Sequence, residues 1–329
     1  MLDALDRQVL HALQSAPRVP FRRLAEVLGV SEQTVARRYR ALLRTGAVRV
    51  VGVVDPAAQG LAEWITRIRC RPDRVGPLAD ALTRRDEIAY AHVASGGSEI
   101  TCIVRAPLGA APEEGLLGQL PRHASVLDVS IDLLLHIFGG GRQIGWTGYG
   151  DLLTPDQLAA LAGHDGAADA DGAPTPISPE DAPLLTGLAA DGRASLADLA
   201  AATGWSPGRV ARRLAALEAA GALDFRVDLL PDALDRPLAA TLWLRVAPAH
   251  LDEVGARVAG HDEVAFAAAI SGRNNIMATV WCRDPHDLYR YLARSVADTP
   301  GIDGYEVSIR ARRLKQAVSV VSRGRLVHA

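Results

Sequence analysis

The chain repeats itself, and this repeat limits its possible folds more than any other feature of the sequence. Residues 24–48 align without a gap with residues 199–223, and a second match joins residues 86–90 to residues 262–266. Among the identical positions of the first match are Gly29 and Gly204, Ser31 and Ser206, Arg37 and Arg212, and Arg38 and Arg213. We therefore predict two copies of one architecture in a chain of 329 residues.

Each copy separates into a helical part and a mixed part, because the spacing of its apolar residues changes. Residues 163–176, between the copies, lack large apolar side chains and are rich in turn formers, which is typical of a connector. Thr154 and Pro155 predict the start of a short helix just before this connector. The predicted domains are residues 1–55 (helix-turn-helix), 60–140 (βαββαβ), 141–176 (linker with the short helix), 177–230 (helix-turn-helix) and 236–329 (βαββαβ).

Composition excludes several classes of protein. The formal net charge is only -2, so the overall charge indicates no partner. The apolar run Leu133–Phe138 is far shorter than the roughly 20 residues that a membrane span needs, and the N-terminus has no secretory pattern. We expect a cytoplasmic protein without membrane contact. Cys70, Cys102 and Cys282 are too scattered for a metal or redox motif, so we expect buried thiols and no metal or cofactor.

The first fifty residues have the pattern of a helix-turn-helix. Leu2, Leu5, Val9, Leu10 and Leu13 predict one amphipathic helix that ends near Pro17. A second helix should end at Gly29, and a third should begin after Ser31 and end at Gly46. Val35, Tyr39 and Leu42 share one side of this third helix and should face the core. The opposite side is free to enter the major groove of duplex DNA.

Local charge favours DNA binding over a merely solvated helix face. Residues 1–50 contain nine arginines and four acidic residues, a net charge of +5, whereas residues 177–226 carry a net charge of -1. A concentrated basic module in a nearly neutral chain is the expected signature of a phosphate binder. We therefore expect the first module to dominate DNA affinity. The candidate DNA contacts are Ser31, Gln33, Thr34, Arg37, Arg38, Arg40 and Arg44, with Ser206, Arg209, Arg212 and Arg213 in the second module.

The second part of each copy alternates strand and helix patterns. Strand patterns at 63–70, 88–94, 100–104 and 126–135 are interrupted by helical patterns near 75–82 and 113–120, and 241–246 repeats the first strand. This order, βαββαβ, predicts a ferredoxin-like antiparallel sheet with two helices on one face. The other face is apolar and must be covered, by the second copy or by a second chain. The basic stretch from Arg310 to Arg325 fits either a further strand or a phosphate contact.

These motifs together resemble the Lrp/AsnC family of bacterial feast/famine transcription regulators in a tandem form. The resemblance rests on Leu24-Ala25, Gly29-Val30-Ser31, Val35-Ala36-Arg37-Arg38 and Gly46-Ala47-Val48, and on their counterparts from Leu199 to Leu223. It implies two winged-type helix-turn-helix domains and two ferredoxin-like RAM domains, an α+β protein. It also implies a sequence-specific regulator whose partners are double-stranded DNA, a small effector such as an amino acid, and a second chain in a homodimer or higher even oligomer.

In that family the effector binds near a glycine-containing turn between the second and third strands. The corresponding residues are Gly96, Gly97, Ser98 and Glu99 in the first copy and Gly272, Arg273, Asn274 and Asn275 in the second. The family usually has aspartate where this chain has Glu99 and Asn275, so only the first turn offers a carboxylate for an effector's ammonium group. The alternative is that these glycines serve only a tight hairpin.

Two other functions remain open at this stage. Tandem proteins that look like Lrp regulators include siroheme decarboxylases, which hold a tetrapyrrole with His and Arg residues. His92 invites this comparison, but the segment Ala89-Tyr90-Ala91-His92-Val93 lacks the arginine of the decarboxylase motif. The remaining alternative is an effector-binding protein that does not contact DNA, which would show no salt-dependent duplex binding.

Overall fold

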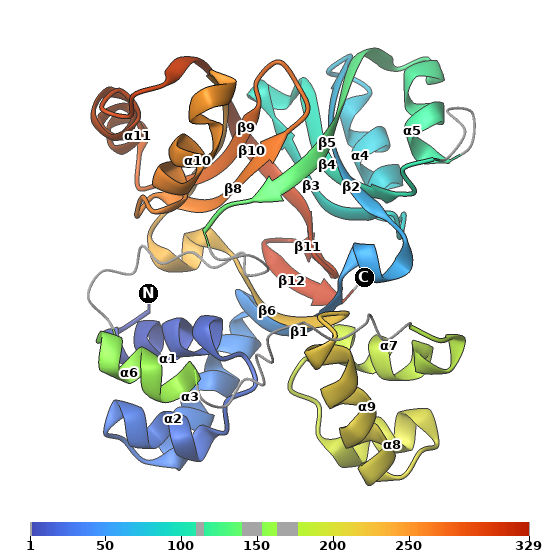
Figure 1. Cartoon of the computed structure of the whole chain (residues 1–329), viewed down its shortest axis with the longest axis vertical. Helices are drawn as coiled ribbons and strands as arrows, with labels where there is room; N and C mark the ends of the chain where they lie inside the picture. The colour runs from blue at the N-terminus through green and yellow to red at the C-terminus, as the bar shows by residue number, and fades with distance from the viewer. Residues whose placement is uncertain (1, 110–114, 140–152, 163–176, 329) are drawn as a thin grey trace. The chain divides into compact units, whose positions relative to one another are not determined.

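The computed structural model describes residues 2–109, 115–139, 153–162 and 177–328 (Figure 1). The chain forms two compact units. Of the described residues, the helical unit comprises 2–60, 153–162, 177–230 and 323–328, and the sheet unit comprises 61–109, 115–139 and 231–322. Among the described helices, none combines the length and the hydropathy that a transmembrane segment requires.

The first helix-turn-helix module has three helices: α1 (Ala4–Ser15), α2 (Phe21–Leu28) and α3 (Glu32–Thr45). Gly29 adopts a left-handed conformation (φ 66°) and ends α2. A residue with a Cβ would adopt this conformation only at a cost in free energy. Ser31 begins α3, since its side chain accepts a hydrogen bond from the Thr34 amide at 3.2 Å. Val35, Tyr39 and Leu42 are buried. The predicted boundaries and buried side of this module are confirmed.

The second module follows the same order with α7 (Ala182–Ala190), α8 (Leu196–Thr203) and α9 (Pro207–Ala219). Ser206 begins α9, as predicted. The strands after the two modules, β1 (Val48–Val54) and β6 (Leu223–Leu229), pair antiparallel with Val51 opposite Arg226. Each of these strands therefore takes its partner from the other module.

A short helix, α6 (Pro155–Ala162), packs against α1 and α2. The Thr154 hydroxyl accepts a hydrogen bond from the Gln157 amide, and the Gln157 side chain accepts one from the Thr154 amide, which confirms the predicted helix start. Leu161 is fully buried. Gln157 Nε2 also donates to the Val27 carbonyl at 3.0 Å, so this helix becomes part of the first module.

The sheet unit contains two successions of strands and helices. The first is β2 (Ala62–Cys70), α4 (Val75–Thr83), β3 (Ile88–Ala94), β4 (Glu99–Ala106), α5 (Leu116–Gln119) and β5 (Val126–Ile137). The second is β7 (Leu238–Val246), α10 (Leu251–Ala259), β8 (Val264–Ile270), β9 (Ile276–Cys282), α11 (Pro285–Tyr291) and β10 (Ile302–Gln316). The strand orders β3-β4-β2-β5 and β8-β9-β7-β10 are those of a ferredoxin-like sheet, as predicted.

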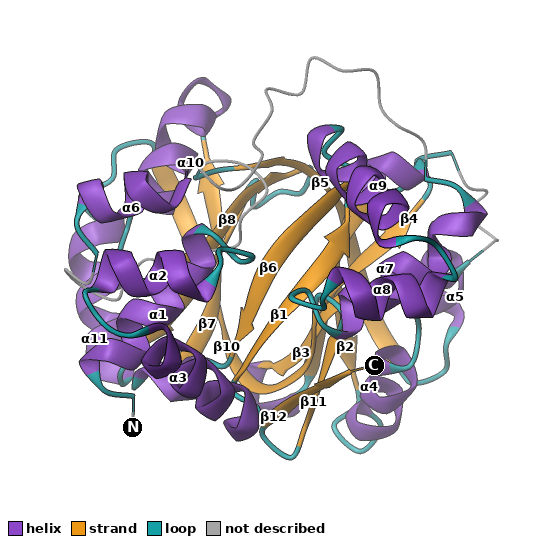
Figure 2. Ribbon diagram, turned by 90° about the horizontal axis from the view of Figure 1, so that it is seen from below, coloured by secondary structure: helices purple, strands orange, loops and turns teal. Residues whose placement is uncertain are grey.

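The two sheets join edge to edge into a closed ring of strands (Figure 2). Strand β5 pairs with β8, where Leu134 lies opposite Ile270, and β10 pairs with β3, where Arg313 lies opposite His92. Side chains from both sheets meet inside the ring in an apolar cluster that includes Ile103, Trp243 and Phe266. The apolar sheet faces therefore cover each other within one chain.

Most of the basic stretch at the C-terminus forms strands, which is one of the two possibilities that its sequence left open. It forms the end of β10 and continues as β11 (Ser319–Ser322), which pairs with β10, and β12 (Arg325–His328). The residues Arg310, Arg313 and Lys315 of β10 line a cavity inside the ring.

Candidate DNA interface and ligand-binding region

Helix α3 presents a row of unpaired arginines on its exposed side. Arg37, Arg40 and Arg44 are exposed, and their three- and four-residue spacing places them along one side of the helix. Within the described residues, their guanidinium groups have no hydrogen-bond or ion-pair partner. Gln33 is also exposed, one turn before Arg37. The three arginines, Arg37, Arg40 and Arg44, are called the α3 arginine row below.

Arg38 differs from its neighbours because it is held inside the module. Its Nη1 lies 2.6 Å from Asp3 Oδ2 and 3.2 Å from Asp6 Oδ1, so it ties α3 to the start of α1. The hydrogen bond to Asp3 raises the pKa of Arg38. The expectation that Arg38 contacts DNA therefore needs correction: its charge is already neutralised by two carboxylates. Ser31 and Thr34 likewise serve the helix start, with their hydroxyls 2.9 Å apart.

Helix α9 offers fewer free charges than α3. Arg212 is exposed, and no partner for its side chain lies among the described residues. Arg209 lies over the Trp205 ring at 4.1 Å and pairs with Glu180 at 2.8 Å. Arg213 pairs with the buried Asp181 at 2.5 Å, so its predicted DNA contact is corrected in the same way as that of Arg38. The repeat places Ala215 and Ala219 where α3 has Arg40 and Arg44.

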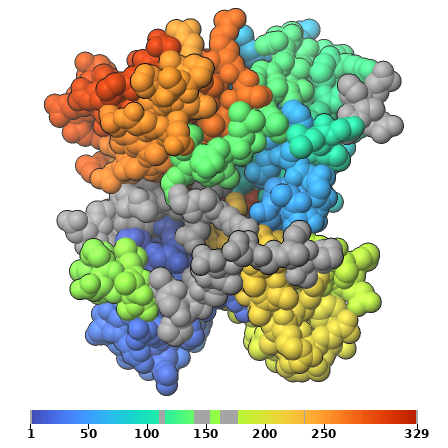
Figure 3. All heavy atoms as spheres, viewed as in Figure 1, coloured from blue at the N-terminus to red at the C-terminus, as the bar shows by residue number. Residues whose placement is uncertain are grey.

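Two arginines missed by the sequence analysis join the modules. Arg18 Nη1 donates to the Gly192 carbonyl at 2.5 Å, and its guanidinium lies over the Phe225 ring. Its counterpart in the repeat, Arg193, donates to the carbonyls of Pro17 and Val19 and lies over the Phe21 ring at 4.5 Å. They are 175 residues apart, which is the shift of the repeat, so the sequence could have identified them as equivalent positions. Each module thus inserts one arginine into the other, and in the space-filling view the first forms the blue surface and the second the yellow one (Figure 3).

The first glycine turn forms a tight hairpin between β3 and β4. Gly96 and Gly97 have φ values of 66° and 90°, and the preceding Ser95 has a φ of 53°. A Cβ added at either glycine would meet nothing within 4 Å, so these glycines serve the backbone conformation and do not make room for a neighbour. The Ser98 hydroxyl closes the turn by donating to the Ser95 carbonyl at 2.9 Å.

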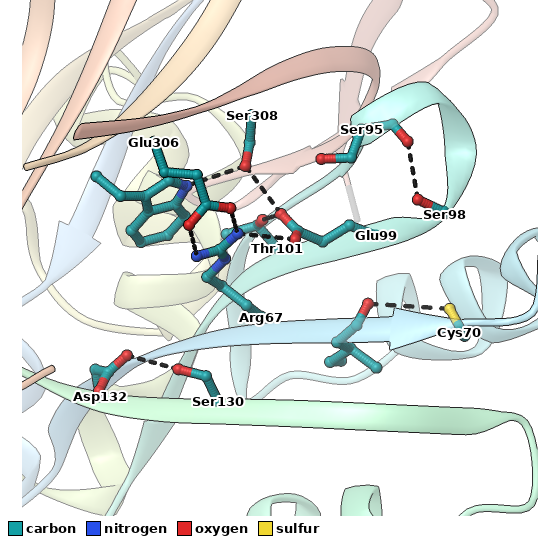
Figure 4. A network of polar contacts seen from close by, with 12 residues as sticks. Arg67, Cys70, Ser95, Ser98, Glu99, Thr101, Ser130, Asp132, Glu306 and Ser308 are labelled. Atoms are coloured by element: carbon teal, nitrogen blue, oxygen red, sulfur yellow. Dashed lines mark hydrogen bonds and ion pairs between the residues drawn. The ribbon is translucent and has the colours of Figure 1, made fainter. Parts of the chain in front are cut away.

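Glu99 is committed to an internal network and does not face a ligand. It is 4% exposed; its carboxylate lies 3.0 Å from Arg67 Nη2 and accepts a hydrogen bond from the Ser308 hydroxyl at 3.1 Å (Figure 4). Arg67 also pairs with Glu306 and lies over the Trp243 ring at 4.4 Å. The expectation that Glu99 pairs with an effector's ammonium is corrected, because Arg67 already neutralises this carboxylate. Arg67 was not singled out from sequence.

The second turn, between β8 and β9, is used differently. Asn275 Oδ1 accepts a hydrogen bond from the Val246 amide at 2.9 Å, and its Nδ2 donates to the Val246 carbonyl at 2.8 Å. Its amide therefore extends the pairing of β7 and is not free for a ligand. Gly272 lies against Asp132, since a Cβ there would be 2.6 Å from the carboxylate. Of the proposed effector residues at this turn, Arg273 is exposed and Asn274 is partly buried.

A cavity of about 70 Å³ lies inside the ring, at the junction of β3 and β10. Its lining combines aromatic rings with basic groups: Tyr90, Phe266 and Trp281, and His92, Arg310, Arg313 and Lys315. His92 was noticed in the sequence, but Arg310 and Arg313 were not connected with it, because they lie more than 200 residues away in the chain. Within the described residues, no cluster of three metal-ligating side chains occurs.

Comparison with known proteins identifies the parts of the chain. The AsnC-type helix-turn-helix domain matches residues 2–43 and 181–218, and the Lrp/AsnC ligand-binding domain matches residues 239–320. An uncharacterized HTH-type transcriptional regulator of Pyrococcus furiosus is 27% identical over 139 residues, which cover 42% of this chain and 94% of the relative. The HTH-type transcriptional regulator LrpA of Pyrococcus abyssi is 28% identical over 111 residues, 33% of this chain and 79% of the relative.

Solved structures of one other protein match nearly the whole chain. The siroheme decarboxylase NirDL has a TM-score of 0.62 at 14% sequence identity, with 96% of this chain and 93% of that chain covered. At this identity the likeness shows a shared fold and no more. The fold and the domain matches define a helix-turn-helix protein with a ligand-binding domain. The chain combines AsnC-type helix-turn-helix domains with an Lrp/AsnC ligand-binding domain, and the relatives reported above are HTH-type transcriptional regulators.

Proposed function

We propose that this regulator reads duplex DNA chiefly through α3, and that the α3 arginine row makes the dominant contacts. The observation that carries this proposal is the separation of the arginines of α3 into two groups. Arg38 is neutralised inside the module, whereas Arg37, Arg40 and Arg44 are exposed and have no ion-pair partner among the residues that the structure describes. A helix of this kind fits the major groove, where guanidinium groups contact phosphates and guanine edges. We propose a cytoplasmic location, because that is where a bacterial regulator meets chromosomal DNA.

The tandem arrangement suggests how the operator is organised. We propose that two Lrp/AsnC-like halves are fused, each with one helix-turn-helix and one RAM domain. The pairing that two separate subunits would make is then made within one chain, through β1 and β6 and through the β3–β10 and β5–β8 junctions. Since α3 and α9 differ in charge, the two half-sites need not be identical. Two such chains would restore symmetry as a homodimer or a higher even oligomer.

We further propose that a small effector acts through the sheet unit. An effector can change DNA binding only if it has unequal affinity for two arrangements of the protein. Amino acids are the first class of effector to test, because the glycine turn is where effectors of this family, often amino acids, bind. Of its residues, Gly96, Gly97 and Ser98 in the first turn, and Gly272, Arg273 and Asn274 in the second, remain candidates. Glu99 and Asn275 are already occupied within the protein.

The test of DNA binding uses the full chain and a duplex selected from random sequence. Affinity is measured by fluorescence anisotropy at several salt concentrations. Replacing Arg37, Arg40 and Arg44 by alanine should reduce affinity by at least about 100-fold and lower the slope of log affinity against log salt by about three, because each phosphate contact releases counterions. The matched control replaces three exposed arginines of the sheet unit, Arg69, Arg84 and Arg122. Equal losses in the two variants would contradict the assignment, and no duplex binding at all would favour an effector-binding protein that does not contact DNA.

A tetrapyrrole enzyme is the second candidate, because the cavity brings His92 together with Arg310 and Arg313. The shared fold with a siroheme decarboxylase makes this candidate worth testing. Against it stand the small cavity and the absence of the decarboxylase motif from residues 89–93. Adding iron uroporphyrin III to the full chain decides the matter. The regulator proposal expects no shifted Soret band, and a stoichiometric shift that is lost in His92→Ala would favour the enzyme.

A further inference from the structure

The cavity at the junction of β3 and β10 has an unusual distribution of charge. Its lining includes Arg310, Arg313 and Lys315 from β10 and His92 from β3. Among the described residues that line it, none is acidic. The lining also includes the aromatic and apolar side chains of Tyr90, Phe266, Trp281, Ile103 and Met277, and the neutral polar side chains of Thr101, Thr279 and Gln316, the last of which accepts a hydrogen bond from Arg313. Basic groups enclosed by apolar walls without a carboxylate are costly unless an anion joins them.

The partners of Arg310 show that its charge is not neutralised by the protein. Its guanidinium donates to the hydroxyl of Thr241 at 3.2 Å and to that of Thr279 at 2.6 Å. Both partners are neutral. Burial and the neighbouring charge of Arg313 lower the pKa of Arg310 to about 9. At neutral pH the group is still charged, so it can bind an anion.

His92 supplies a second, independent sign of an unfilled polar site. It is 6% exposed, and its Nε2 is buried without a hydrogen-bond partner. Burial, together with the charges of Arg310 and Arg313, holds the pKa of His92 well below its usual range, so the ring is neutral at pH 7. A neutral imidazole donates one hydrogen bond and accepts another. Buried groups of this kind normally have a partner, which a bound ligand would provide.

Two irregularities of β10 direct its basic side chains into this space. Along β3 the partners run from Ala94 through Val93 and His92 to Ala91, while on β10 they run from Arg310 through Arg312 and Arg313 to Lys315. The register therefore shifts twice within six residues. In a regular strand Arg310 and Arg313 would point to opposite faces. The bulges bring both into the lining, and bulges often re-aim side chains at functional sites.

We propose that this cavity binds a small organic acid, with the carboxylate at Arg310 and Arg313 and the hydrocarbon body against Tyr90, Phe266 and Trp281. Because the lining contains no carboxylate, nothing there compensates an ammonium group. The site therefore favours acids without an amino group, such as short 2-oxo acids, over amino acids, and the cavity volume of about 70 Å³ restricts it to small ones. The idea that this acid acts as an effector rests on the proposed regulatory function, whereas its binding does not.

The ligand would join the two halves of the sheet unit. Its carboxylate contacts β10 of the second half, and its body contacts Tyr90 of β3 in the first half and Phe266 of β8 in the second. Binding should therefore stabilise the β3–β10 pairing, which the two bulges weaken. Hydrogen exchange at the amides of β3 should slow when the ligand is present.

The test measures binding by calorimetry and the thermal midpoint of the full chain, without DNA, in a buffer free of phosphate and carboxylates. The probes are pyruvate, propionate, alanine and 1-propanol, whose size suits a cavity of about 70 Å³. Pyruvate or propionate should bind and raise the midpoint, and alanine and 1-propanol should bind at least tenfold more weakly. If neither acid binds, or if alanine binds as well as pyruvate, the proposal is wrong.

A pair of variants on one strand locates the site. Arg310→Met removes the charge but keeps a long apolar side chain, and it should reduce acid binding at least tenfold without lowering the thermal midpoint of the ligand-free protein. Arg312→Met, whose parent side chain is 54% exposed on the same strand, should leave binding unchanged. Equal binding by wild type and Arg310→Met would overturn the assignment. Salt-dependent duplex binding is measured separately, so the acid site and the regulatory function can fail independently.

Discussion

Asp181 accepts two hydrogen bonds from Arg213, with Nε 2.7 Å from Oδ1 and Nη2 2.5 Å from Oδ2. The carboxylate belongs to the turn before α7 and the guanidinium to α9, so the pair joins the first and third helices of the second module. The first module has the same arrangement, in which Arg38 of α3 pairs with Asp6 of α1. In both modules the arginine holds the third helix, α3 or α9, to an aspartate at or near the start of the first helix. The two arginines of each consecutive pair therefore differ in role. Arg37 and Arg212 are exposed, whereas Arg38 and Arg213 form ion pairs within their modules.

Breaking the pair in the second module should destabilise it strongly. Asp181 is 1% exposed, and Arg213→Met would leave its buried charge without an ion-pair partner, with only the hydrogen bond from the Ser178 amide, at a cost of about 3 kcal/mol. Arg38→Met should destabilise its module less, because the Arg38 side chain is 27% exposed and Asp3 is half exposed. Hydrogen exchange at the amides of α9 and α3 measures both effects. Arg212→Met, one residue away and exposed, is the control, and a comparable loss there would refute the bracing role.

The ion pair between Asp181 and Arg213 predicts that the stability of the second module depends on pH. The hydrogen bond from Arg213 lowers the pKa of Asp181 below its ordinary value of 3.8. Between the folded and unfolded pKa values, the unfolded chain binds more protons, so stability falls as the pH falls. The contribution of this pair is complete above about pH 5 and is lost progressively below pH 4. Urea unfolding of the helical unit from pH 6 to pH 3 should show this loss, and the Arg213→Met variant should show a smaller one. Parallel curves would contradict the linkage.

Local chemistry explains which features could be predicted from sequence. Ser31, Gly29 and Gly46 act on backbone groups within a few residues, so the bounds of α2 and α3 follow from short-range rules. Glu99 shows the limit. Its partners Arg67 and Ser308 lie 32 and 209 residues away, so nothing near Glu99 in the sequence distinguishes a buried ion pair from a ligand contact. The bulges of β10 are similar, since a regular strand would separate Arg310 from Arg313.

Restoring the missing arginines to α9 should increase DNA affinity. Ala215 and Ala219 occupy the positions of Arg40 and Arg44, so the double variant Ala215→Arg and Ala219→Arg recreates the row beside Arg212. Two further phosphate contacts should steepen the salt slope by about two and tighten binding at low salt. Arginine at the exposed Ala201 of α8 is the control for added charge. An unchanged slope in the double variant would show that α9 does not approach the duplex.

The Glu99 network should matter for stability more than for ligand binding. Glu99→Ala leaves Arg67, which is 17% exposed, with only the outer partner Glu306, and should lower the stability of the sheet unit by about 2–3 kcal/mol. Glu306→Ala should cost less than about 1 kcal/mol, because Glu306 is 52% exposed. Thermal unfolding gives both values. If Glu99→Ala instead kept full stability and abolished effector binding, the carboxylate would have to be reassigned to the ligand site.

The crossed arginines of the two modules predict a fixed distance between DNA half-sites. Arg18 and Arg193 each donate to main-chain carbonyls of the other module, and β1–β6 pairing adds a continuous ladder between them. A protein joined this way should lose affinity sharply when base pairs are inserted between the half-sites, because α3 and α9 cannot follow. Replacing Arg18 and Arg193 by alanine loosens the junction and should reduce that penalty, even if affinity for the original operator falls. Anisotropy with duplexes carrying zero, two and five inserted base pairs measures the difference. An equal penalty in wild type and the double variant would mean that the strand ladder alone sets the spacing.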